Sequence, residues 1–273
     1  MVRRIACFFT CGHTESGAMQ SFLQKINDNY VFRQCLPNKP KRKQGRTDVS
    51  LVAEGATGSS LHREVYRILR MNRDEYRHYS AIMIEDDLDN RFSGMNDDQI
   101  SAYKSEITMK VRENVDVEQM PVIFLYASPE VEAWFLADWN NSFFQVYTDR
   151  GIINDVSQTK ALDYYVHCLK RYIDANLVDT TKDDIEAYGE QTMGESDKLS
   201  ARLQQIVRDE VKQYIREQSD SDDTFFDELY SSKKLYYSKR IHGTEMLRRI
   251  VPENVAGKCR RFFFDAYMDL RNL

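Results

Sequence analysis

The chain has 273 residues, of which 42% are hydrophobic and 12% aromatic, enough for one substantial core, and this composition excludes a wholly disordered protein. Its formal net charge of -5 excludes a uniformly cationic surface, so any contact with nucleic acid must come from a local basic patch. Its longest apolar runs, such as Ile5 to Phe9, are far shorter than the roughly 20 residues that span a bilayer, and we expect a cytoplasmic protein without membrane contact.

The first part of the chain predicts strands that alternate with helices. Residues 5–10 are typical of a buried strand, and Gly12 begins a turn into an amphipathic helix whose apolar face includes Met19 and Phe22. A weak strand around Val31 and Phe32 is followed by a basic loop, and a helix follows residues 55–60.

Two more central strands are predicted at residues 79–84 and 121–126, separated by a helix that Asp97 and Asp98 can cap. After the second of these strands, Ser128 is expected to cap a helix beginning at Pro129. Strands separated by helices at this spacing predict an α/β fold, with a central sheet of parallel strands flanked by helices.

The second half of the chain is predicted to be mainly helical. Apolar residues recur at helical spacing between residues 161–173 and again between residues 199–215, and two closing helices are expected over residues 243–250 and 256–270. The organisation that we predict is an α/β core over residues 1–140, a helical insertion or subdomain over 141–230, and C-terminal helices over 231–273 that pack back on the core.

Acidic residues follow the strand at residues 79–84, where open α/β sheets place their ligand sites. In an extended segment Asp87 and Asp89 would point the same way and share one cation, and Glu85 has the same parity. Carboxylates suit Mg²⁺ or Mn²⁺, which need only one or two protein oxygens besides water and phosphate. The alternative interpretation is a solvated acidic turn.

Two other strand ends carry acidic residues. Glu15 follows the first strand, and Glu130 and Glu132 follow the last. Each alone is explained by the stabilisation of a helix N-terminus. Together, however, these side chains would repel one another on one rim of the sheet unless a cation or a basic partner neutralised them.

Basic residues gather in two places. The first is a loop that suits a phosphodiester backbone, or is simply solvated, and contains Lys39, Lys41, Arg42, Lys43 and Arg46. The second, with Lys239 and Arg240, either faces the acidic rim or is a charged connector. Residues 55–60 lack the Lys of a phosphate-binding loop, so Gly58 to Ser60 either contacts a phosphate or caps a helix.

Five segments, distributed over most of the chain, resemble a group of toprim-like bacterial proteins that are often encoded beside ABC-type ATPases in anti-phage defence loci. The residues that carry the resemblance are Thr10 to Glu15, Ile84 to Asp89, Glu130 to Asp138, and Lys239 to Gly243 with Cys259 to Phe262. The segment Glu-Val-Glu-Ala-Trp-Phe-Leu-Ala-Asp at Glu130 to Asp138 is the most specific of them.

The resemblance implies a toprim fold, in which a Glu after the first strand and an Asp-x-Asp after a later strand hold Mg²⁺ for phosphodiester hydrolysis. By this analogy Glu15, Asp87 and Asp89 are the catalytic residues of a nuclease that acts on DNA or tRNA with a partner ATPase. Members of the group usually have Glu at the position of Cys11. The alternative is therefore a subunit that has kept the fold and lost the catalysis, and serves as a binding or sensor module.

Overall fold

The computed structural model describes residues 3–10, 17–37, 56–149, 156–181, 184–190, 198–218 and 235–273. At its centre lies a sheet of four parallel strands in the order β2-β1-β3-β4. The strands are β1 (Arg3–Phe8), β2 (Tyr30–Leu36), β3 (Ala81–Asp87) and β4 (Val122–Ala127). The predicted α/β fold, with parallel strands flanked by helices and a helical C-terminal half, is confirmed.

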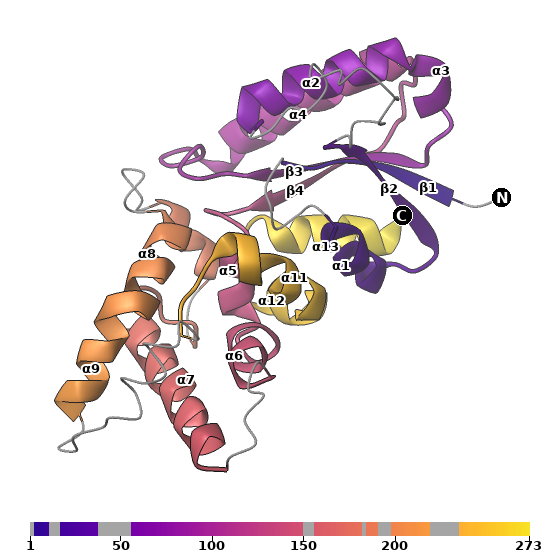
Figure 1. Cartoon of the computed structure of the whole chain (residues 1–273). Helices are drawn as coiled ribbons and strands as arrows, with labels where there is room; N and C mark the ends of the chain where they lie inside the picture. Colours follow the sequence, from indigo (N-terminus) through magenta and orange to yellow (C-terminus); the bar gives the residue numbers. More distant parts are fainter. Residues whose placement is uncertain are drawn as a thin grey trace, which may run out of the picture.

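Helices cover both faces of the sheet, as Figure 1 shows. One face carries α2 (Gly58–Met71), α3 (Arg73–Tyr76) and α4 (Asp97–Val115). The other carries α1 (Met19–Ile26) and α13 (Phe263–Asn272). Strand alternation explains the two layers, because Ile82 and Ile84 pack into the α2 and α4 side while Ala81 and Met83 pack into the opposite side.

The remaining helices follow β4 and form the helical half of the molecule (Figure 1). They are α5 (Glu132–Ala137), α6 (Gln145–Asp149), α7 (Val156–Asn176), α8 (Leu199–Gln205), α9 (Val211–Gln218), α11 (Thr244–Arg249) and α12 (Pro252–Lys258). Short π-helical turns are η2 (Asn140–Phe144), η5 (Ile206–Glu210) and η6 (Lys239–Gly243), and η3 (Ile185–Glu190) is a 3-10 turn. No helix of the described residues is long and apolar enough to cross a membrane.

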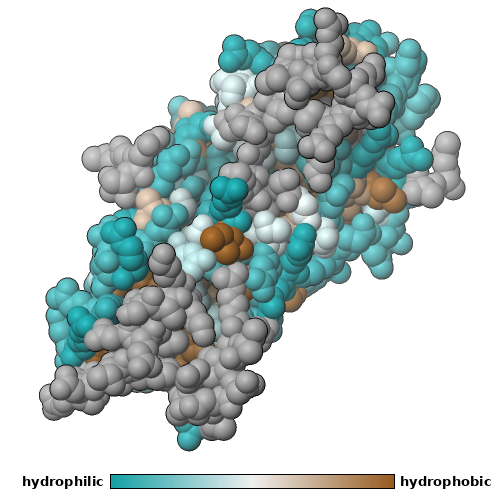
Figure 2. Space-filling model, viewed as in Figure 1, coloured by the Kyte–Doolittle hydropathy of each residue, from teal (hydrophilic) through white to brown (hydrophobic). Residues whose placement is uncertain are grey.

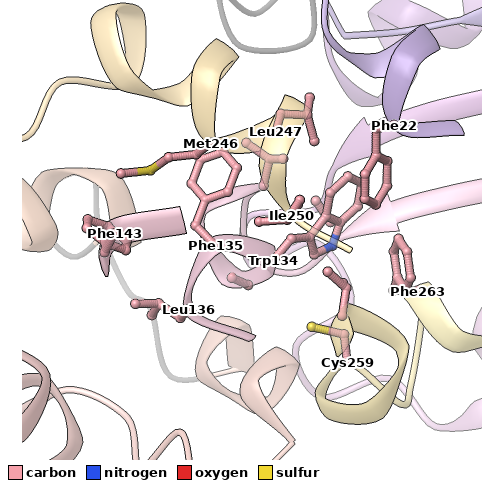
Figure 3. Packing of buried hydrophobic residues seen from close by; sticks show 14 of the residues in the cluster. Phe22, Trp134, Phe135, Leu136, Phe143, Met246, Leu247, Ile250, Cys259 and Phe263 are labelled. Carbon is pink, nitrogen blue, oxygen red and sulfur yellow. The ribbon is translucent and has the colours of Figure 1, made fainter. Parts of the chain in front are cut away.

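The core on the α13 side is built around Trp134 of α5 (Figure 3). Its ring stacks on Phe22 of α1, with centroids 5.6 Å apart, and meets Phe263 of α13 edge-on at 5.1 Å. The same buried cluster extends without a break from the sheet to apolar residues of α7 and α9, such as Leu169 and Ile215. The sheet and the helical half therefore share one hydrophobic core.

Three predicted boundaries are wrong. The predicted helix at Pro129 begins at Glu132, and the Ser128 hydroxyl donates to the Glu186 carbonyl instead of capping it. The strand predicted at residues 79–84 instead runs from Ala81 to Asp87, so β3 itself contains the acidic residues up to Asp87. The single helix predicted over residues 256–270 is two helices, α12 and α13.

The break between α12 and α13 has a packing reason. Phe262 lies in the cluster on the α2 and α4 side, against Phe92 and Tyr126, whereas the next residue, Phe263, lies in the Trp134 cluster. Successive residues of a continuous helix differ by only about 100° in direction. The turn before α13 lets two adjacent aromatic rings enter the two cores on opposite sides of the sheet.

The face seen in Figure 2 is mainly hydrophilic, with apolar residues scattered over it. Among the described residues, the exposed large hydrophobic side chains are Val31, Met71, Met109, Tyr164, Ile241, Phe264 and Met268. They belong to six different elements, and only Phe264 and Met268 are neighbours on one helix. Single apolar residues of this kind are normal on a folded protein.

Candidate functional site

Three carboxylates converge at the carboxyl edge of the sheet, and we call Asp87, Glu130 and Glu132 the carboxylate cluster. Asp87 ends β3, and its register partner Ala127 ends the adjacent parallel strand β4. Glu130 follows three residues later, and Glu132 opens α5. Because parallel strands end at the same edge, the chain brings together acidic residues that lie more than forty positions apart.

The ammonium of Lys239, at the start of η6, lies among these three side chains. Its Nζ is 3.3 Å from Asp87 Oδ2, 3.2 Å from Glu132 Oε2 and 3.7 Å from Glu130 Oε1. The Lys239 side chain is 22% exposed, whereas those of Asp87 and Glu132 are 15% and 0% exposed. In the part of the chain that the structure describes, one positive charge thus lies within ion-pair distance of three largely buried acidic groups.

Each carboxylate also accepts hydrogen bonds from a second element. The Val131 N–H donates to Asp87 Oδ1 at 3.2 Å. The Ser200 N–H and hydroxyl, in α8, both donate to Glu130, at 2.9 and 3.1 Å. The two contacts of Ser200 join the helical half of the molecule to the cluster.

The cluster remains short of compensating charge. Burial raises the pKa of Glu132 to about 7, although Lys239 and the hydrogen bond from the Tyr237 hydroxyl favour its ionised form. Burial, together with neighbouring Glu130 and Asp89, raises the pKa of Asp87 against the lowering effect of Lys239. Glu132 Oε2 is buried, and no described residue donates to it a hydrogen bond of good geometry, although the Lys239 ammonium is within ion-pair distance. An oxygen in this state favours a cation or a proton beside it.

Glu85 points to the same side of the sheet as Asp87, as its parity predicts, but it does not join the cluster. Its side chain is fully buried, and Oε2 accepts from the Thr10 N–H at 3.0 Å and from the Thr10 hydroxyl at 2.9 Å. Thr10 is the last described residue before residues 11–16. Glu85 therefore holds the chain that leaves β1 against β3.

Strand alternation does not extend from Asp87 to Asp89, because β3 ends at Asp87. Asp89 has a left-handed backbone, with φ of 50°, and its N–H donates to the Pro129 carbonyl. Strand alternation does not apply to such a residue. Asp89 Oδ1 lies 3.5 Å from Nζ of Lys198, the residue immediately before α8.

Asp86, which the sequence analysis did not select, has a distinct role. It points to the opposite face from Asp87, accepts from the Gly58 N–H at the start of α2, and pairs with Arg91. Burial raises its pKa to about 6 even so. The N-terminus of α2, one of two interpretations of which was a phosphate contact, is thus bound by a carboxylate of the protein, and the Ser60 hydroxyl accepts from the Thr57 N–H, as in a helix cap.

Several predicted site residues lie outside the described residues. They are Glu15 and the basic residues Lys39, Lys41, Arg42, Lys43 and Arg46. Of the second basic pair, Lys239 faces the carboxylate cluster, whereas Arg240 is exposed. The predicted role of Glu15 and of the basic loop stays a prediction.

Carboxylate oxygens are the ligands that a hard divalent cation prefers. The distances of these oxygens from Lys239 Nζ, however, are those of ion pairs with an ammonium. Mg²⁺ requires oxygens at about 2.0–2.1 Å, and the oxygens here lie 3.2–3.7 Å from Nζ. Consistently, the described part of the chain holds no three His, Cys, Asp or Glu side chains grouped as metal ligands. Binding of a metal would require the carboxylates to draw together and Lys239 to withdraw.

Comparison with known proteins identified no relative of the chain. No family model, curated protein or solved structure matches the chain. The resemblance to toprim-like proteins therefore depends on the short motifs, of which Glu130 to Asp138 supplies two members of the carboxylate cluster and the core residue Trp134.

Proposed function

We propose that this protein is a divalent-metal-dependent nuclease that hydrolyses phosphodiester bonds of DNA or RNA, as an effector of an anti-phage defence system with a partner ATPase. The observation that carries the proposal is the convergence of Asp87, Glu130 and Glu132 at the carboxyl edge of a parallel sheet. The nature of the reaction, the defence role and the ATPase come from the resemblance of the motifs.

The chain's own residues suggest how such a site would work. Asp87, Glu130 and Glu132 would hold Mg²⁺ or Mn²⁺, which when bound activates water and stabilises charge on the phosphate. The Val131 N–H and the Ser200 N–H and hydroxyl fix the orientations of Asp87 and Glu130. Arg240 is exposed beside the cluster's lysine, where it would attract a nucleic-acid backbone.

A second function, a catalytically inactive binding or sensor subunit of an ATPase complex, is favoured by two observations. Cys11 stands where the resembling proteins usually have a Glu. Lys239 already neutralises part of the negative charge that would otherwise require a metal ion. Such a protein would bind nucleic acid or a partner without cutting anything.

The decisive experiment is a cleavage assay with the purified chain. The protein, alone and with any ATPase encoded beside it, is incubated with plasmid DNA and with total tRNA in Mg²⁺ or Mn²⁺. The nuclease predicts cleavage that EDTA stops and that Asp87→Asn abolishes. A matched control is Asp97→Asn, because the Asp97 side chain is 97% exposed and lies at the start of α4.

The two functions give different results. Cleavage by the wild type and Asp97→Asn, with none by a folded Asp87→Asn, supports the nuclease. Binding of tRNA or DNA without cleavage under any of these conditions, with or without the ATPase, favours the inactive subunit. Cleavage that persists in Asp87→Asn would assign the activity to a contaminant or to another site.

A further inference from the structure

The lysine within the carboxylate cluster points to a regulatory device. Lys239 Nζ makes a hydrogen bond of 3.3 Å to Asp87 Oδ2 and lies 3.2 Å from the buried Glu132 Oε2. The three carboxylates come from β3 and the start of α5, whereas Lys239 comes from a separate segment more than a hundred residues later. The positive charge is thus carried by a part of the chain that is distant in sequence from the carboxylates.

Residues 235–243 hold the ammonium in place through contacts of their own. The Tyr237 side chain is buried, and its hydroxyl donates to Glu132 Oε1 at 2.9 Å. The Tyr236 carbonyl accepts from the Tyr147 hydroxyl at 2.9 Å. The Ser238 N–H donates to His242 Nδ1 at 2.9 Å, which closes the turn that presents Lys239. The segment therefore contacts both oxygens of Glu132, one with a tyrosine and one with a lysine.

A divalent ion and this ammonium compete for the same oxygens. Two like charges a few ångströms apart repel strongly in a site where two of three carboxylates are almost fully buried. Both also draw electron density from Asp87 Oδ2 and Glu132 Oε2, so each weakens the binding of the other. The four-carbon stem of a lysine, by contrast, allows its head to move into solvent without a change in the backbone.

We propose that Lys239 is an intramolecular antagonist of divalent-cation binding, which holds the carboxylate cluster closed until residues 235–243 or the lysine side chain moves away. The inference rests on the proposed function only in taking this cluster as the cation site. The observed association constant for a metal is then the intrinsic constant multiplied by the fraction of molecules in which Lys239 has left the cluster. Because that fraction is small, the observed affinity is low. Any partner that draws Lys239 out of the cluster raises that affinity and so activates the site.

Direct binding of Mn²⁺ to the full chain tests this device, with the free ion followed by its electron paramagnetic resonance. Lys239→Met is compared with Arg240→Met, which removes the same charge from the exposed neighbouring position. We expect Lys239→Met to bind Mn²⁺ at least about tenfold more tightly than the wild type, and Arg240→Met to change the affinity by less than about threefold. Equal or weaker binding by a folded Lys239→Met overturns the proposal.

A second measurement uses the wild-type chain and does not depend on the folding of a variant. Acetylation of individual lysines by acetic anhydride is followed by mass spectrometry with and without Mn²⁺. Displacement predicts that Mn²⁺ accelerates modification of Lys239 severalfold while the exposed Lys110 reacts at an unchanged rate. If Mn²⁺ slows the acetylation of Lys239 or leaves its rate unchanged, Lys239 is not an antagonist of the metal.

Failure of this inference and failure of the proposed function are distinguishable. If the wild type binds Mn²⁺ and Asp87→Asn abolishes that binding, but Lys239→Met binds no more tightly, the metal site stands and only the antagonist is rejected. If neither the wild type nor Lys239→Met binds Mn²⁺ at millimolar concentrations, both the metal site and its antagonist are rejected.

Discussion

Lys239 Nζ lies 3.2 Å from Glu132 Oε2, and the carboxylate it faces is fully buried at the first residue of α5. This pair joins the C-terminal part of the chain to the edge of the sheet. A buried acidic group loses its hydration on folding, so it needs either a positive neighbour or a proton. The raised pKa of Glu132, about 7, indicates that Lys239 compensates this loss only in part.

Removal of the ammonium should therefore destabilise the protein in a pH-dependent way. At pH 8, without divalent ions, we expect Lys239→Met to lower the free energy of unfolding by about 2–4 kcal/mol, since it leaves buried carboxylates without their cation. At pH 5.5 the loss should be smaller, because Glu132, whose pKa already lies near 7, and Asp87 take up protons more readily once Lys239 is gone. Urea unfolding at the two pH values measures this difference, and an equal loss at both would contradict it.

The contact between Thr10 and Glu85 predicts a second effect on stability. Thr10→Val keeps the shape of the side chain and removes the hydroxyl that donates to Glu85 Oε2 at 2.9 Å. A hydrogen bond to a buried carboxyl group contributes about 1–3 kcal/mol, so we expect a loss of that size in the free energy of unfolding. Thr10→Ser retains the hydroxyl and should lose less. A Thr10→Val variant that is as stable as the wild type would contradict a stabilising role of this hydrogen bond.

The sequence predicted the sheet well because buried parallel strands leave a local signal. Runs of apolar residues bounded by helices identified the four strands of the described sheet, and acidic residues at the end of β3 and after β4 lie together at one edge of it. Glu130 and Glu132 were selected for the same reason, and they do meet Asp87. What local pattern could not give was the direction of Asp89, since a left-handed residue ends strand alternation.

Long-range partners were the other part that the sequence could not supply. Tyr237 and Ser200 carry no motif, and each meets the carboxylate cluster only because distant helices pack together. Lys239 was recognised as basic, with two interpretations left open, and only tertiary structure distinguishes a lysine that faces an acidic rim from a charged connector. Asp86 and Asp87, by contrast, could be separated locally, because strand alternation sends them to opposite faces.

Trp134 provides a test of the shared core. Its ring is fully buried between Phe22 and Phe263, and its indole nitrogen has no hydrogen-bond partner among the described residues. Trp134→Ala should lower the free energy of unfolding by about 3–5 kcal/mol through the cavity it leaves. Trp134→Phe should cost less than about 2 kcal/mol, because it keeps an aromatic ring and removes an unsatisfied donor. A single unfolding transition should persist in both variants, since the sheet and the helical half share this cluster, and a separate transition for the helical half would contradict that view.

Glu186 is a carboxylate that holds the start of α13. It belongs to η3 in the helical half, its side chain is buried, and it accepts the backbone N–H groups of Arg261, Phe262 and Phe263 at 2.7, 2.8 and 3.0 Å. These donors favour the ionised form, yet burial outweighs them and raises its pKa from 4.5 to about 7. Between these two values the native state binds a proton that the unfolded chain does not bind.

The stabilisation from this proton has a definite sign. It is complete below about pH 4.5 and is lost as the pH rises through about 7, so the wild type should become less stable between pH 5 and pH 8. Asp86 and Glu132, whose pKa values are also raised, contribute in the same direction. Glu186→Gln cannot titrate, and we expect its decline in stability over this range to be smaller than that of the wild type by about 1–3 kcal/mol. Glu118→Gln, on the exposed surface, should decline like the wild type. Chemical denaturation at pH 5, 6.5 and 8 measures all three proteins, and parallel curves for Glu186→Gln and the wild type would show that Glu186 stays ionised in the folded protein throughout.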